Sequence, residues 1–119
     1  MTQLQALLLS ILIEVPVVLA LAQVLGVGAR VGWRRLALVG CTATLLTHPF
    51  AWHGFPLLAD AVPNYPLRAL IIEGGVATVE GLLYGTIGRA GLARGQALGW
   101  VSNAVSYGIG LVLFRLVLA

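Results

Sequence analysis

Six polar side chains, four of them ionisable, interrupt stretches of this sequence that are otherwise almost wholly apolar. They are Glu14, His48, Glu73, Glu80, Asn103 and Ser106. Carboxylate, amide and hydroxyl oxygens are hard ligands, and the single imidazole is a borderline one. This set suits protons, Na⁺ or a divalent cation such as Mg²⁺ or Mn²⁺ better than a soft metal. The residue types therefore point first to the binding or passage of protons or cations.

The elements that carry these side chains are four apolar runs, each long enough to cross a membrane. We expect helices over about 3–25, 36–55, 67–88 and 95–118. A helix rises about 1.5 Å per residue and the hydrocarbon core is about 30 Å thick. No run alternates with period 2, so strands of a membrane barrel are excluded. The sequence predicts an all-α fold, a single integral membrane domain over 1–119 built as an antiparallel bundle of four transmembrane helices.

The overall composition agrees with a protein of the bilayer. Of 119 residues, 60% are hydrophobic and 9% are charged, whereas soluble domains carry about 25% charged residues. The one cysteine, Cys41, excludes an internal disulfide and a CxxC motif. The first apolar run is long enough to span, so we expect no cleavable signal peptide. These observations exclude a soluble globular protein.

The seven basic residues are all arginines, and they lie at the ends of the apolar runs. This placement is typical of topology determinants and anionic-lipid contacts, so nucleic acid is not an expected partner. One side of the predicted bundle carries Arg30, Arg34, Arg35, Arg89 and Arg94. The opposite side carries Arg68 and Arg115. The positive-inside rule then predicts a multi-pass protein of the bacterial inner (cell) membrane with both termini outside the cytoplasm.

The polar residues fall at similar depths in the four predicted helices. Counted from the outer ends, the depths run from about 9 Å for Glu73 to about 22 Å for Asn103. Glu73 and Glu80 are seven residues apart and share a helix face. A charged side chain inside the membrane costs roughly 2.5–3.5 kcal/mol on insertion scales, so these carboxylates need a partner or a proton. The sequence therefore predicts one polar layer near the midplane.

Small residues recur at helical spacing along the second, third and fourth runs. The predicted helix-packing residues are Gly40, Thr44, Thr47, Gly81, Gly85 and Gly99. Small side chains let membrane helices approach closely and form hydrogen bonds across the contact. The GxxxG matches among them fit packing within one chain as well as dimerisation.

Three classes of function fit this pattern. The favoured hypothesis is a proton or cation channel or transporter, or a transporter subunit. It would act as a homo-oligomer or within a larger membrane complex, because four helices enclose little volume. The second is a non-catalytic structural or accessory subunit. A membrane enzyme is least favoured, because paired Glu-x-x-His motifs and a marked Ser-His or Cys-His pair are absent from the sequence. No cofactor is expected, and the lipid bilayer is the expected partner.

The polar residues also resemble a recurrent pattern of small uncharacterised four-helix bacterial integral membrane proteins. The residues that carry the resemblance are Glu14, Thr47-His48-Pro49, Glu73, Glu80, Asn103 and Ser106. It covers the whole chain and implies a four-helix membrane fold without a known activity. The pattern has Thr-Asn-Pro where this chain has His48 in place of the Asn. The resemblance favours a functional role for the polar layer.

Overall fold

The computed structural model describes residues 1–118, and these residues form helices and short connections only. The helices are α1 (Gln3–Val24), α2 (Gly28–Val31), α3 (Trp33–Leu57), α4 (Tyr65–Gly85) and α5 (Leu92–Leu118). The predicted all-α class is therefore confirmed. The four long helices follow the four apolar runs, and the single-turn helix α2 lies in the first connection, where the sequence suggests a tight turn.

Left-handed backbone conformations explain where the observed helix ends differ from the predicted ones. Helix α3 begins at Trp33 rather than near residue 36, directly after Gly32 with φ of 95°. Helix α4 ends at Gly85 rather than near residue 88, because the chain reverses through Arg89 and Gly91 with φ of 57° and 87°. Glycine adopts such angles without steric cost. Helical periodicity alone does not reveal these turns.

Side-chain caps fix the starts of α1 and α4. The Thr2 hydroxyl accepts a hydrogen bond from the Gln5 backbone N–H at 3.2 Å, and the Gln5 side chain accepts one from the Thr2 N–H at 2.9 Å. At α4, the Asn64 side chain accepts from the Leu67 N–H at 3.0 Å. These bonds satisfy backbone donors that a helix start leaves unpaired.

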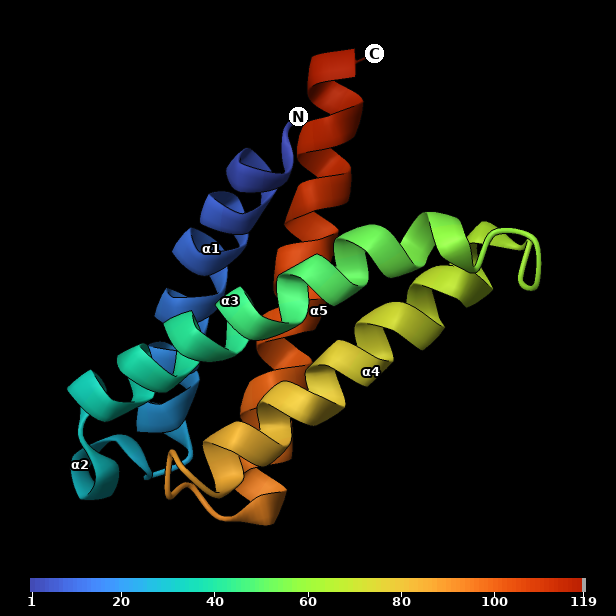
Figure 1. Ribbon diagram of the computed structural model, residues 1–119. Helices are drawn as coiled ribbons and strands as arrows, with labels where there is room; N and C mark the ends of the chain where they lie inside the picture. Colours follow the sequence, from blue (N-terminus) through green and yellow to red (C-terminus); the bar gives the residue numbers. More distant parts are fainter. Residues whose placement is uncertain (119) are drawn as a thin grey trace.

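The four long helices form a ring in the order α1, α3, α4, α5 (Figure 1). Each packs against its two neighbours, so α1 faces α4 across the bundle and α3 faces α5. Both ends of the chain lie at the end of the bundle away from α2. Towards that end, α3 and α4 lean away from α1 and α5. The ring therefore encloses a centre that all four helices reach, and its two halves separate at one end.

Helices α4 and α5 make the closest backbone contact in the bundle. A Cβ atom placed on Gly99 would lie 2.5 Å from the Ala77 carbonyl oxygen and 2.6 Å from the Gly81 nitrogen. One placed on Gly95 would lie 2.4 Å from the Gly85 nitrogen. Real Cβ atoms do not approach backbone atoms this closely. The structure thus places the GxxxG glycines at a helix contact within the chain.

Large apolar side chains cover much of the outer surface of the bundle, whereas two of its acids are buried. Large apolar side chains point outward from all four long helices, as for Leu12 (71% exposed) and Phe50 (80% exposed), while Glu14 and Glu80 are only 4% and 1% exposed. Helix α1 and the stretch Leu92–Leu116 of α5 are long and apolar enough to cross a membrane. Only a minority of the residues in these two stretches are buried.

Arginine side chains tie the first and third connections together at the α2 end. Arg30 Nη2 donates to the carbonyl oxygens of Arg89 and Ala90 at 3.2 and 3.3 Å. Arg35 Nη1 donates to the Ile87 carbonyl oxygen at 2.9 Å. These carbonyls belong to the turn after α4, whose oxygens have no partner within the helix. The arginine-rich connections therefore share one end of the bundle.

Replacing Arg35 with Ala is expected to lower the free energy of unfolding by about 1 kcal/mol, because the Ile87 carbonyl loses its donor. Thermal unfolding in detergent, followed by circular dichroism, measures the change. Arg94→Ala is the matched control, since it removes the same charge from the neighbouring helix start. Equal losses in the two variants would show that charge alone, and not the bond to Ile87, stabilises this end.

Candidate functional site

Six buried polar side chains from all four long helices meet at the centre of the bundle. This central polar cluster consists of Glu14, Thr44, Thr47, Glu80, Asn103 and Ser106. The Thr44 hydroxyl donates to Glu14 Oε2 at 2.8 Å. On the other side, Asn103 Nδ2 donates to Glu80 Oε2 at 2.9 Å and to the Gly99 carbonyl at 2.8 Å. The cluster thus links α1 to α3 and α4 to α5.

Thr47 has more acceptors within reach than it has hydrogens. Its hydroxyl oxygen lies 2.9 Å from the Ala43 carbonyl oxygen and 2.7 Å from Glu80 Oε1. A hydroxyl carries one hydrogen and can donate only once. Both contacts are hydrogen bonds at the same time when the Glu80 carboxyl carries a proton and donates it to Thr47. In that state every polar atom of Glu80 has a partner.

The donors that bond to the two central carboxyls are all uncharged: two threonine hydroxyls and one amide. The Ser106 hydroxyl and the Glu80 carboxyl both lie near the Glu14 carboxyl. Two carboxylates in one low-dielectric site repel each other when both are ionised. A proton or a cation between Glu14 and Glu80 removes that repulsion, so this pair is suited to hold one.

The Tyr84 side chain extends the cluster towards the α2 end. It follows Glu80 by one helical turn and is fully buried, and no described residue forms a hydrogen bond with its hydroxyl. Gly40 makes room for it, because a Cβ atom there would lie 2.7 Å from the Tyr84 hydroxyl oxygen. The same ring packs in an apolar cluster with Val18, Leu36 and Leu98. This apolar cluster closes the α2 end of the bundle below the carboxyls.

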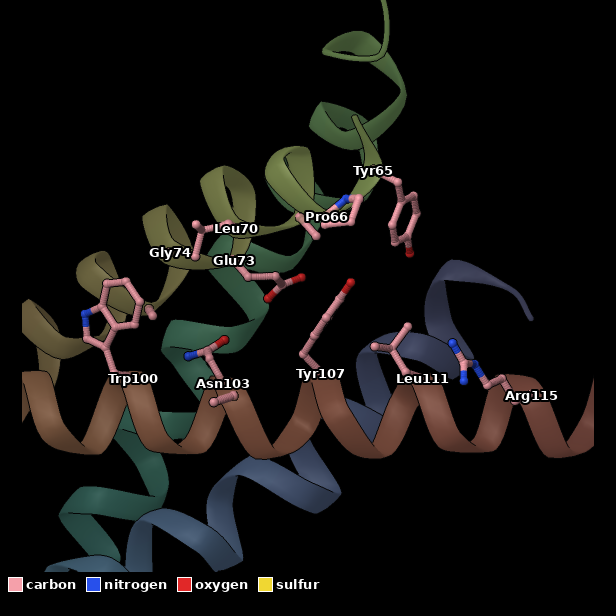
Figure 2. Close-up of a pocket in the computed structure, with 13 residues that line it drawn as sticks. Tyr65, Pro66, Leu70, Glu73, Gly74, Trp100, Asn103, Tyr107, Leu111 and Arg115 are labelled. Atoms are coloured by element: carbon pink, nitrogen blue, oxygen red, sulfur yellow. The ribbon is translucent and has the colours of Figure 1, made fainter. Parts of the chain in front are cut away.

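A cleft of about 520 Å³ lies between α4 and α5 at the opposite end (Figure 2). We call it the α4–α5 cleft. Its lining includes the polar or aromatic residues Tyr65, Glu73, Trp100, Asn103, Tyr107 and Arg115. Asn103 therefore belongs to both the cleft and the central cluster. Only the Asn103 side chain separates the cleft from Glu80.

The structure does not bring all the predicted site residues together. Glu14, Glu80, Asn103 and Ser106 gather in the central cluster, as listed above. Glu73 instead lines the α4–α5 cleft, although its carboxyl is near enough to that of Glu80 for their charges to interact. His48 is half-buried beside the cluster residue Thr47, with its ring centroid 5.9 Å from that of Trp52. The His48 Nε2 atom is buried, and it has no hydrogen-bond partner within residues 1–118.

Several residues of the site are not among the predicted ligands. Thr44 and Thr47 were expected only to pack helices, yet they supply hydrogen bonds to the two carboxyls. Tyr84 and Tyr107 follow Glu80 and Asn103 by four residues, which places them on the same helix faces. That spacing is the signal by which the sequence could have revealed them. Among residues 1–118, no group of three His, Cys, Asp or Glu side chains is placed to hold a metal ion.

The central cluster and the cleft are connected, and they lie at the centre and at one end of the bundle. No family model, curated protein or solved structure matches this chain.

Proposed function

We propose that this chain is a four-span membrane protein that carries protons through its buried carboxyl pair, Glu14 and Glu80. The observation that supports the proposal most is the pairing of these two acids at the centre of a bundle whose outer surface is apolar. Only uncharged donors bond to them. Carboxyls at such a position need a proton or a cation to remain there.

The membrane location is supported by helix length and by the outward apolar side chains. Helices α3 and α4 contain 25 and 21 residues, so they extend about 37 and 31 Å at 1.5 Å per residue. Both expose large apolar residues, among them Leu38, Phe50 and Leu70. Together with α1 and α5, these are the four spans that we propose. The five arginines at the α2 end favour an orientation with that end in the bacterial cytoplasm and both termini outside.

Proton transfer follows from the hydrogen-bond geometry at Thr47. When Glu80 is protonated, it donates to Thr47, and Thr47 donates to the Ala43 carbonyl. When the proton leaves, the Thr47 hydrogen can rotate to the Glu80 carboxylate, 2.7 Å away. The carboxylate then keeps two donors, since Asn103 also bonds to it. Both protonation states of Glu80 thus fit the same backbone.

Access to the carboxyl pair is asymmetric. The α4–α5 cleft reaches Asn103 from the end that carries the chain termini. At the other end, Val18, Leu36 and Leu98 pack around Tyr84. A proton reaching the α2 end requires a rearrangement of this apolar cluster, so the geometry favours a gated carrier over an open pore. Assembly into a homo-oligomer remains part of the proposal, because the enclosed volume of one bundle is small.

A structural role for the polar cluster is the competing function. It is favoured by the complete set of hydrogen bonds at Glu80, which needs no ligand beyond a proton. In membrane bundles, such bonds hold helices in register and contribute about 0.6–2 kcal/mol each. A structural subunit would keep the cluster but would not move protons.

Proton flux in reconstituted liposomes tests the proposal. Vesicles hold a trapped pH-sensitive dye, and a potassium diffusion potential drives protons inward. We expect faster acidification than in protein-free vesicles, scaling with the amount of protein. The Asp60→Asn variant is the matched control, because Asp60 is an exposed acid in the connection between α3 and α4. Acidification at the protein-free rate would contradict proton transport and would favour the structural role.

A further inference from the structure

The α4–α5 cleft has the size and lining of a site for a small organic molecule. Its volume of about 520 Å³ lies within the range of about 300–1,000 Å³ that is usual for such sites. The walls are mostly apolar, with Leu70 and Leu111 on opposite helices. Figure 2 shows the Glu73 carboxyl and the hydroxyls of Tyr65 and Tyr107 pointing into the same space. A few polar groups thus converge within an apolar cavity.

Glu73 is the acidic residue among those that line this cleft. The nearest arginine on α4, Arg68, does not neutralise it. The Arg68 guanidinium lies over the rings of Phe55 and Tyr65, at 4.5 and 5.8 Å from their centroids. Arg115 lies at the outer end of the cleft, about 12 Å further along α5 than Tyr107 at 1.5 Å per residue. The inner part of the cleft therefore carries an acidic group without a counter-charge.

We propose that the α4–α5 cleft binds a lipophilic organic cation, meaning a positive centre surrounded by apolar or aromatic groups. The Glu73 carboxyl supplies the opposite charge, and the aromatic side chains of Trp100 and Tyr107 line the same cleft. The apolar walls accept the remaining surface of the molecule. An inorganic cation would leave those walls without a partner, and an anion would be repelled by Glu73. The acidic group and the apolar walls together therefore favour an organic cation as the ligand.

The inference rests on the proposed function, because the cation would bind beside the carboxyl pair proposed to carry protons. Glu73 and Glu80 lie on one face of α4, and Asn103 both lines the cleft and donates to Glu80 at 2.9 Å. A positive charge beside Glu73 disfavours a proton on the neighbouring carboxyl. Binding of the cation is therefore expected to release a proton from the carboxyl pair.

Fluorescence of Trp100 provides a direct binding test in detergent solution. The chain contains three tryptophans, so a variant with Trp33→Phe and Trp52→Phe reports on Trp100 alone. The probe is tetraphenylphosphonium, and its control is tetraphenylborate, which has nearly the same shape and the opposite charge. We expect a saturable change with the cation only. Glu73→Gln should weaken binding at least about tenfold, because it removes a charge-assisted contact. Asp60→Asn should leave the affinity unchanged.

Two results would overturn the inference. Equal responses to the two probes would show an apolar groove without charge selection, and unchanged affinity in Glu73→Gln would place the cation elsewhere. Circular dichroism of each variant verifies the fold, and the conservative Glu73→Asp variant should retain part of the affinity. Proton flux without cation binding would remove this inference and leave the proposed function standing. Cation binding without proton flux would overturn the proposed function and leave a cation site that is not linked to proton transfer.

Discussion

Liposomes that contain the Glu80→Gln variant are expected to lose proton flux by roughly 100-fold, the loss typical when a positioned acid–base group is removed. Glutamine cannot release or take up a proton at neutral pH. Its geometry nevertheless reproduces the protonated acid: the amide nitrogen can donate to Thr47, and the amide oxygen can accept from Asn103. The hydrogen bonds of the central cluster should therefore survive while the transferable proton disappears.

Stability measurements separate this effect from misfolding. Thermal unfolding of Glu80→Gln in detergent should lie close to that of the wild type. Glu80→Leu should be less stable by about 1–3 kcal/mol, because the Asn103 amide and the Thr47 hydroxyl lose their partner in a buried site. If Glu80→Gln folds normally and still conducts at the wild-type rate, Glu80 is not the proton carrier and the cluster is structural.

Replacing Gly99 with Leu is expected to cause a large loss of stability, at least about 3 kcal/mol. The backbones of α4 and α5 meet at this glycine, and the first atom of any side chain would lie 2.5 Å from the Ala77 carbonyl oxygen. Backbone atoms cannot move aside as a flexible side chain does, so the two helices must separate. Their separation would also break the Asn103–Glu80 bond, which spans the same contact.

Gly108→Leu is the matched control for this prediction. Gly108 lies on the same helix, and a Cβ atom there would meet nothing within 4 Å. Chemical denaturation in mixed detergent, followed by helicity and by Trp fluorescence, gives the free energy of unfolding for both variants. Similar stabilities for Gly99→Leu and Gly108→Leu would mean that α4 and α5 do not pack through Gly99.

The identities of the central polar residues were predictable because they lie within runs of sequence that are otherwise apolar. Glu14 and Glu80 interrupt apolar runs. A carboxyl in such a run costs free energy on insertion into lipid unless it has a partner or a proton. The depth count placed them in one layer, and the structure brings both to the bundle centre. Depth does not reveal direction around the helix axis relative to the neighbours, however. Glu73 shares a helix face with Glu80 and was grouped with it, yet it lines the α4–α5 cleft two turns away.

The unknown direction of side chains around the helix axis also explains why His48 was predicted as a ligand and the two threonines were not. His48 and Thr47 are adjacent in sequence, so their side chains point about 100° apart on the helix, and only one can face the centre. His48 was favoured as a ligand because of its residue type. In the packed bundle, Thr47 faces the centre and contacts Glu80. The imidazole lies beside Trp52 instead. Which face of α3 is central depends on how α3 packs against α1 and α4.

The sequence by itself determined that this chain is helical, since its hydropathy comes in runs of helical, bilayer-crossing length and its charges fall between them. It also determined which side chains are out of place in an apolar setting. Only the tertiary structure decided which of them meet, because that depends on the order of the helices around the ring and on the glycine contact between α4 and α5. Contacts between residues tens of positions apart leave no periodic trace in one chain, and so the Thr47–Glu80–Asn103 chain of hydrogen bonds and the cleft beside it emerge only when the helices are packed.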